Sequence, residues 1–281
     1  MGKRFILNAD DFGMTKEYNR AVLEGFNNGI LTSASLCANG SAFSAAVNDI
    51  LPECAGLGLG VHLNIIEGKS LTGCNLLTDK NGDFNKGYLF YILNSNNKNV
   101  LSQIEKEFRA QIEKVKKYTN IDHIDSHVHT HAIPPIFELV CKLAEEYNIP
   151  CIRTQHEHFY TVSSFKKHIG LSYPLNLIKI VLLNLFTAKN KTVLKKFNLK
   201  TNNYIIGVGY TGMMDSDTVR AGLEALPETD CIAEALIHPC CYVDKVIKNS
   251  HTREFSITLD KKLKDDIYRL GFTLTNYKNL L

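Results

Sequence analysis

Histidines gather in one short stretch of this chain. Four of its ten histidines fall within nine residues, in the segment His123-Ile-Asp-Ser-His-Val-His-Thr-His131. If this stretch is a strand, Asp125, His127, His129 and His131 share one face, because alternate side chains point the same way. One buried histidine is often only a hydrogen-bonded core residue, but burying several polar groups without partners costs kilocalories each. A metal ion would be a shared partner. Since a strand rises about 3.3 Å per residue, His127 and His131 would lie about 13 Å apart, so the segment supplies one or two ligands.

Two adjacent aspartates form a second candidate group. Asp10 and Asp11 follow the apolar run 4–7, and active sites of α/β barrels are built at the carboxyl ends of strands. Consecutive strand residues point to opposite faces, so both carboxylates reach one site only if the chain leaves the strand there, as Phe12-Gly13 indicates. A solvated turn with one helix-capping aspartate is the alternative, and it explains two carboxylates less well.

Single ionisable residues end three further apolar runs: His62, Arg153 and His238. Each one alone is as readily structural as functional. Together with the aspartates and His127, however, they place charged or polar groups at the ends of the first, third, fourth, fifth and seventh expected strands. An aspartate and two histidines, with positions left for water and substrate, make a hydrolytic metal site. The set suits Zn²⁺, and the hard aspartate also admits Mg²⁺ or Mn²⁺.

The elements that carry these residues alternate between strand and helix patterns. Short apolar runs bounded by turn-forming residues predict eight strands, at 4–7, 31–38, 57–63, 121–128, 150–154, 204–208, 231–237 and 272–276. Most are separated by stretches with helical periodicity, which predicts βαβ units and a parallel sheet. No GxGxxG or GxxxxGK[ST] loop follows the first strand, so we expect a closed barrel rather than an open nucleotide-binding sheet.

Two segments interrupt this alternation. Residues 64–100 are rich in Gly and Asn and are expected to form a loop-rich excursion. Residues 159–203 contain eight Lys, no Asp or Glu, and the strongly apolar run 177–186. We favour an inserted helical pair that packs on the barrel. The alternative is a basic, apolar flap that faces an anionic or lipid-bearing partner.

Composition excludes several classes of protein. The 281 residues are 44% hydrophobic and 22% charged, as in an ordinary globular protein, and one domain over 1–281 is expected. A net charge of +3 is too small for a protein that mainly binds nucleic acid. No apolar run reaches the about 20 residues of a membrane span. Early acidic residues and eight scattered cysteines without a CxxC pair favour a cytoplasmic protein with reduced thiols.

Several spaced motifs resemble the YdjC family of carbohydrate deacetylases, whose best-known members deacetylate chitooligosaccharides. They are Asn8-Ala-Asp-Asp-Phe-Gly13, Gly60-Val-His-Leu-Asn64, Ile124-Asp-Ser-His-Val-His129 and Ile237-His-Pro239. Weaker signatures are Gly29-Ile-Leu-Thr-Ser33, Glu107-Phe-Arg-Ala-Gln111 and Arg153. The resemblance implies an irregular (β/α) barrel of the glycoside hydrolase/deacetylase type, with mostly parallel strands and often dimeric. One departure is Cys240, which stands where the family usually has Gly after the His-Pro step.

The same resemblance implies roles for individual residues. Asp10 would be the catalytic base and His238 the general acid. One divalent metal ion, Mg²⁺ or Zn²⁺, would have three protein ligands: Asp11, His62 and His127. The remaining candidates would contact the substrate or support the ligands: Asp125, His129 and Arg153.

The expected function is therefore metal-dependent hydrolysis of N-acetyl groups on amino sugars such as diacetylchitobiose. The expected partners are a small carbohydrate substrate and a second copy of the chain. One alternative is a deacylase of a lipid-linked or anionic sugar at the membrane surface. A second is a metal-dependent phosphoesterase, although such barrels commonly carry the HxH pair on the first strand. A third is a binding module that kept the barrel.

Overall fold

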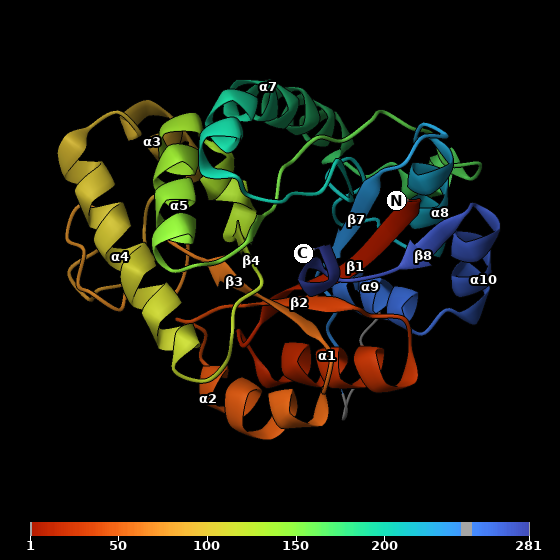
Figure 1. Cartoon of the computed structure of the whole chain (residues 1–281), viewed down its shortest axis with the longest axis horizontal. Coiled ribbons are helices and arrows are strands. Elements are labelled where there is room, and N and C mark those ends of the chain that lie inside the picture. Colours follow the sequence, from red (N-terminus) through yellow and green to blue (C-terminus); the bar gives the residue numbers. More distant parts are fainter. Residues whose placement is uncertain (1, 243–248, 281) are drawn as a thin grey trace.

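Parallel strands form the centre of the protein. The computed structural model describes residues 2–242 and 249–280, and helices surround the strands (Figure 1). The strands are β1 (Lys3–Phe12), β2 (Ser33–Leu36), β3 (Gly58–Leu63), β4 (His123–Ser126), β5 (Cys151–Ile152), β6 (Tyr204–Ile206), β7 (Ile232–Ile237) and β8 (Phe272–Leu274). Their order is β5-β4-β3-β2-β1-β7-β6, with β8 also paired to β1, and every pairing is parallel. The expected irregular (β/α) barrel is confirmed, and each expected strand is present.

The helices cover this curled sheet from outside (Figure 1). They are α1 (Lys16–Asn28), α2 (Phe43–Ala45), α3 (Tyr88–Asn94), α4 (Lys98–Lys116), α5 (Pro134–Glu146), α6 (Phe165–His168), α7 (Tyr173–Phe197), α8 (Ser216–Glu224), α9 (Ser250–Thr258) and α10 (Lys261–Arg269). In α4 the buried apolar residues Ile104, Phe108, Ile112 and Val115 recur every three or four positions, so one face packs against the core. None of the described helices is long and apolar enough to cross a membrane.

Strand β1 is longer than its sequence pattern predicts. The apolar run ends at Leu7, but the strand continues through Asn8, Asp10 and Asp11 to Phe12, and all of these are buried. The register with β2 shifts between Ala9 and Phe12, which is a β-bulge. Polar residues can extend this strand because the barrel interior holds hydrogen-bonding partners for them.

β5 and β6 are the two ends of the strand order, and irregular backbone hydrogen bonds together with side chains link the segments beside them. Asn202 accepts a hydrogen bond from the Thr154 backbone N–H at 2.7 Å and donates to the Thr154 carbonyl at 2.9 Å. The buried Glu157 carboxylate accepts the backbone N–H groups of three consecutive residues, Gly207, Val208 and Gly209. Burial raises the pKa of Glu157 to about 7 despite these three bonds. The two edges are thus joined without a regular ladder in this region.

The two interrupting segments both lie next to the barrel. The excursion 64–100 contains α3, and its loop is fastened to α4 because the buried Glu107 carboxylate accepts bonds from Ser70 and Thr72. The basic segment 159–203 is mostly the 25-residue helix α7, which packs on the barrel beside α5 (Figure 1).

Candidate active site

A β-bulge turns the two adjacent aspartates toward one end of the barrel. Asp11 has a φ of 64°, in the left-handed region, so the alternation of side chains is broken between Asp10 and Asp11. The expectation that the strand ends before these residues is wrong, because the bulge reorients them within the strand. Both carboxylates are buried.

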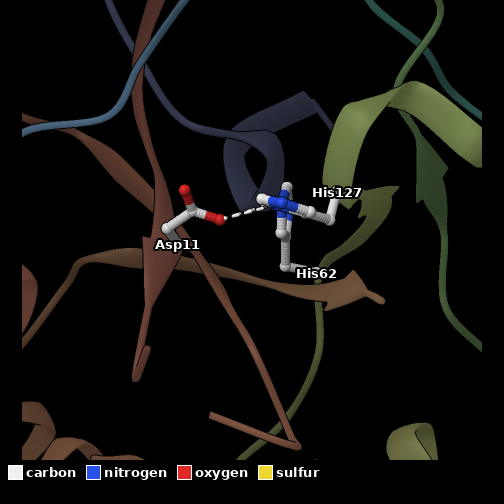
Figure 2. A group of neighbouring side chains, drawn as sticks. All are labelled: Asp11, His62 and His127. Carbon is white, nitrogen blue, oxygen red and sulfur yellow. Dashed lines mark hydrogen bonds and ion pairs between the residues drawn. The ribbon is translucent and has the colours of Figure 1, made fainter. Parts of the chain in front are cut away.

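Asp11, His62 and His127 form a compact cluster from three elements (Figure 2). The Asp11 Oδ1 atom lies 2.9 Å from His127 Nδ1 and 3.5 Å from His62 Nε2. One ligand atom from each residue lies within 4.8 Å of the others, which is close enough for all three to hold one metal ion. Burial opposes ionisation of Asp11, but the neighbouring histidines hold its pKa below the ordinary value.

Asp125 orients His62 within this cluster. Its Oδ1 atom lies 2.7 Å from His62 Nδ1, which leaves Nε2 facing Asp11. A carboxylate behind a metal-bound histidine commonly fixes the ring in this way. Ser35 donates to the other Asp125 oxygen at 2.6 Å. The donor types and their support therefore fit a divalent cation such as Zn²⁺ or Mg²⁺.

Arg153 binds several buried carboxylates at the centre of the barrel. Its Nη1 and Nη2 atoms donate to both oxygens of Asp10 at 2.8 and 2.7 Å. Its Nε and Nη2 atoms also donate to Glu234, at 2.9 and 2.6 Å, and Nη2 pairs with Asp125 at 2.7 Å. Burial would raise the pKa of Asp10, but the Arg153 charge lowers it, so Asp10 is a carboxylate. Three buried carboxylates thus surround one guanidinium, and a bound cation beside them would offset the excess negative charge.

His238 follows β7 and is held by Glu254 of α9. The Glu254 carboxylate accepts a hydrogen bond from the His238 backbone N–H at 2.5 Å and lies 3.2 Å from the ring Nδ1. Burial lowers the pKa of His238, but the Glu254 carboxylate outweighs this and raises it to about 10. The ring therefore carries a proton at neutral pH and can donate it.

The histidines after His127 are not on a strand. Strand β4 ends at Ser126, and 127–132 forms tight 3₁₀ turns in which Val128 and His129 have positive φ angles of 52° and 58°. The prediction that Asp125, His127, His129 and His131 share one strand face is therefore wrong beyond the strand end.

This turn separates the roles of its last two histidines. The buried His129 Nδ1 atom has no hydrogen-bond partner among the described residues, and burial lowers the ring's pKa to about 3. His131 is instead bonded to Ser126 and to the Arg153 carbonyl, which is a structural role.

A positive φ at a β-branched residue such as Val128 is strained, and such strain persists at functional sites.

A cavity of about 250 Å³ opens beside this cluster. Its ionisable lining includes Asp10, His127, His129 and His238, so four sequence-predicted residues meet there. The rest of the lining is mostly apolar: Tyr88, Val128, Leu182, Leu183, Val208 and Leu236. Lys179 of α7 also lines it. The basic insert thus forms part of the candidate active site, and Tyr88 and Lys179 are lining residues that the sequence did not single out.

Sequence reasoning also missed the partners that hold the site. Glu234 binds Arg153, and the Tyr277 hydroxyl donates to its other oxygen at 2.5 Å. Asn8 donates to Asp10 at 2.8 Å. One signal was present: Glu234 is the only charged residue in the apolar run 231–237, and a buried charge needs a partner. The sequence alone does not identify this partner, because the pairing depends on the fold.

Solved structures share this architecture. A proposed cellobiose-phosphate cleavage protein from Enterococcus faecalis V583 matches with a TM-score of 0.77 and 21% identity, covering 100% of this chain and 99% of that one. An uncharacterized protein from Agrobacterium tumefaciens C58 matches with a TM-score of 0.55 and 11% identity, over 100% and 89% of the two chains. At these identities the similarity defines only the class of fold, which is the irregular (β/α) barrel described above.

Sequence comparisons define the family. A carbohydrate deacetylase from Clostridium beijerinckii is 36% identical over 181 residues, 63% of this chain and 71% of that protein. A carbohydrate deacetylase from Thermoanaerobacter pseudethanolicus is 28% identical over 99% of both proteins. The YdjC-like protein family model matches residues 4–269. The chain belongs to the YdjC-like protein family, which confirms the resemblance found in its motifs.

Proposed function

We propose that this protein is a metal-dependent carbohydrate deacetylase that removes N-acetyl groups from amino sugars, with chitooligosaccharides such as diacetylchitobiose as substrates. One observation carries the proposal. A carboxylate (Asp10) and a protonated imidazole (His238) line one cavity, directly beside a group suited to bind a metal. Relatives named carbohydrate deacetylase support the substrate class.

Asp11, His62 and His127 would hold one divalent ion, Zn²⁺ or Mg²⁺. When bound, such an ion lowers the pKa of water and polarises an acyl oxygen. The protein's own contribution is to fix the three ligands. Asp125 holds the His62 ring, and the bulge at Asp11 directs its carboxylate to both histidines.

Asp10 would accept a proton from the attacking water. Arg153 keeps it ionised and fixes both of its oxygens, so Arg153 acts as a positioning residue. As the water oxygen bonds to the acetyl carbon, the carbon–nitrogen bond breaks, and His238 would donate its ring proton to the departing amine. The products are acetate and the free amino sugar. The apolar lining would exclude other water from this cavity.

The test is acetate release from diacetylchitobiose by metal-stripped protein, with Zn²⁺ or Mg²⁺ restored. We expect release only with metal. Asp10→Asn should lower turnover by about 10²–10⁴-fold, the usual range for a general base, while metal content stays unchanged. Asp49→Asn, in the segment between α2 and β3, is the matched control. Metal-independent release, or full activity of Asp10→Asn, would contradict the proposed mechanism, and no release with either metal would contradict the substrate.

A further inference from the structure

Helix α7 has apolar residues on two sides, and only one side is packed. Its buried positions are Asn176, Ile180, Leu183, Thr187 and Asn190, spaced three or four residues apart along one side. Ile180 and Leu183 pack with Val208 and Leu236 of the barrel. The inner side of the helix is therefore already occupied.

Polar side chains fix this orientation. Asn190 donates to the Ala132 carbonyl at 2.8 Å, and Asn184 donates to the Glu157 carbonyl at 2.9 Å. Thr187 accepts the backbone N–H of Gln155 at 3.2 Å. These bonds tie α7 to the turn 127–132 and to the loop after β5, so the helix cannot roll to bury its other side.

The opposite side of α7 is aliphatic and exposed. We call Leu175, Ile178, Val181 and Leu185 the α7 outer face; 62% of Leu175 and 64% of Ile178 are exposed. In the turn before the helix, Leu171 is fully exposed. An aliphatic stripe of this length on a fixed helix is typical of an interaction surface. Lys179 and Leu182, which fall between Ile178 and Leu185 in the sequence, line the candidate active-site cavity.

Charge indicates the kind of partner. The segment 159–203 carries eight of the 32 Lys and Arg of the chain and none of its 29 Asp and Glu. A second copy docked symmetrically through this face would bring the same acid-free segment against it, and the like charges would repel. Protein interfaces are moreover enriched in Tyr, Trp and Arg and depleted in Lys, whereas this face combines Leu, Ile and Val with nearby Lys. Exposed aliphatic side chains beside lysines, in a segment without carboxylates, complement a lipid surface that carries negative charge.

We propose that the α7 outer face docks on an anionic lipid surface. The aliphatic side chains enter the boundary between headgroups and acyl chains, while the lysines of the segment contact lipid phosphates. Docking of this kind would bring the cavity beside Lys179 and Leu182 close to the membrane, where a sugar presented at that surface is accessible. The docking itself does not depend on the proposed deacetylase function; only the access of a membrane-presented sugar rests on it.

The test is co-sedimentation of the full chain with vesicles of phosphatidylglycerol and phosphatidylcholine, and with phosphatidylcholine alone. We expect binding to the anionic vesicles that weakens as salt increases. Removing the apolar face should lower the affinity about tenfold or more, because binding scales with buried apolar area. The variant is Leu175→Gln/Ile178→Gln/Leu185→Gln, and its control is Leu259→Gln/Tyr268→Gln at exposed positions of the C-terminal region. The charge variant is Lys189→Gln/Lys195→Gln/Lys196→Gln, and its control on α10 is Lys261→Gln/Lys262→Gln/Lys264→Gln.

Three results would overturn the docking proposal. The first is that the wild-type chain does not sediment with anionic vesicles at low salt. The second is that the α7 variants and their controls bind equally well. The third is a dimer in sedimentation velocity that the apolar α7 variant converts to monomer, without vesicle binding. Acetate release from a soluble chitooligosaccharide, measured separately, should be the same for all these variants. Vesicle binding without acetate release would refute the proposed function and leave the docking intact.

Discussion

Replacing Glu254 by glutamine tests whether His238 acts as a protonated acid. The Glu254 carboxylate is buried and contacts both the backbone N–H and the ring Nδ1 of His238. This contact is the main reason that the pKa of His238 is raised to about 10. Glutamine keeps the size and can still accept the backbone hydrogen bond, but it removes the charge. The pKa of His238 should then fall.

The size of the effect follows from the protonated fraction of the ring. If the pKa of His238 falls to the ordinary value of about 6.5, only about 3% of the rings stay protonated at about pH 8, so turnover falls about thirtyfold. At about pH 5.5 most rings are protonated in both proteins, and the rates should differ little. The descending limb of the pH–rate profile therefore moves to lower pH, because the His238 ring loses its proton at a lower pH once its pKa has fallen.

The assay is acetate release from diacetylchitobiose between about pH 5 and pH 10. Glu228→Gln is the control, because the Glu228 side chain is 95% exposed and pairs only loosely with Lys3, at 3.4 Å. Metal content and circular dichroism should match the wild type. A descending limb at the same pH in Glu254→Gln and wild type would refute the assignment of His238 as the acid.

Three further predictions concern the metal, the buried charges and the buried Glu157 between β5 and β6. His62→Ala or His127→Ala should lose bound Zn²⁺ after dialysis while His158→Ala keeps it; equal metal contents by mass spectrometry would contradict the ligand set. Arg153→Met should lower the free energy of unfolding in urea by about 3–5 kcal/mol, because three buried carboxylates lose their partner; a loss below about 1 kcal/mol would contradict this. Burial raises the pKa of Glu157 from the ordinary 4.5 to about 7, so the folded state holds this proton more tightly and stability should fall as pH rises between these values. Glu157→Gln should remove that slope in urea unfolding, and an unchanged slope would exclude Glu157 as its source.

The strands were predictable from sequence because parallel strands buried on both faces are continuous apolar runs. β7 (Ile232–Ile237) and β3 (Gly58–Leu63) are such runs apart from Glu234 and His62. β1 was predicted too short, since its polar second half looks like a turn until the partners inside the barrel are known. β4 was predicted too long, because nothing local shows that Val128 and His129 adopt positive φ angles.

The positions of polar residues at strand ends predicted which residues meet, but not which hydrogen bonds and ion pairs join them. Arg153 and Glu234 are 81 positions apart, and only the closed barrel brings them within 2.6 Å. The position of α7 was likewise hidden, because a helix that is apolar on two sides gives no sign of which side is packed. Lys179 therefore became a cavity residue only in the structure.

The left-handed backbone at Asp11 restricts which residue this position tolerates. Glycine, asparagine and aspartate enter that region readily, whereas for other residues the left-handed conformation costs about 1–2 kcal/mol of conformational free energy. Of those three, aspartate alone offers a carboxylate. Glutamate would keep the charge at the expense of backbone strain, and asparagine would keep the backbone and lose the charge. Asparagine is therefore the substitution that isolates the chemistry of this residue from its conformation.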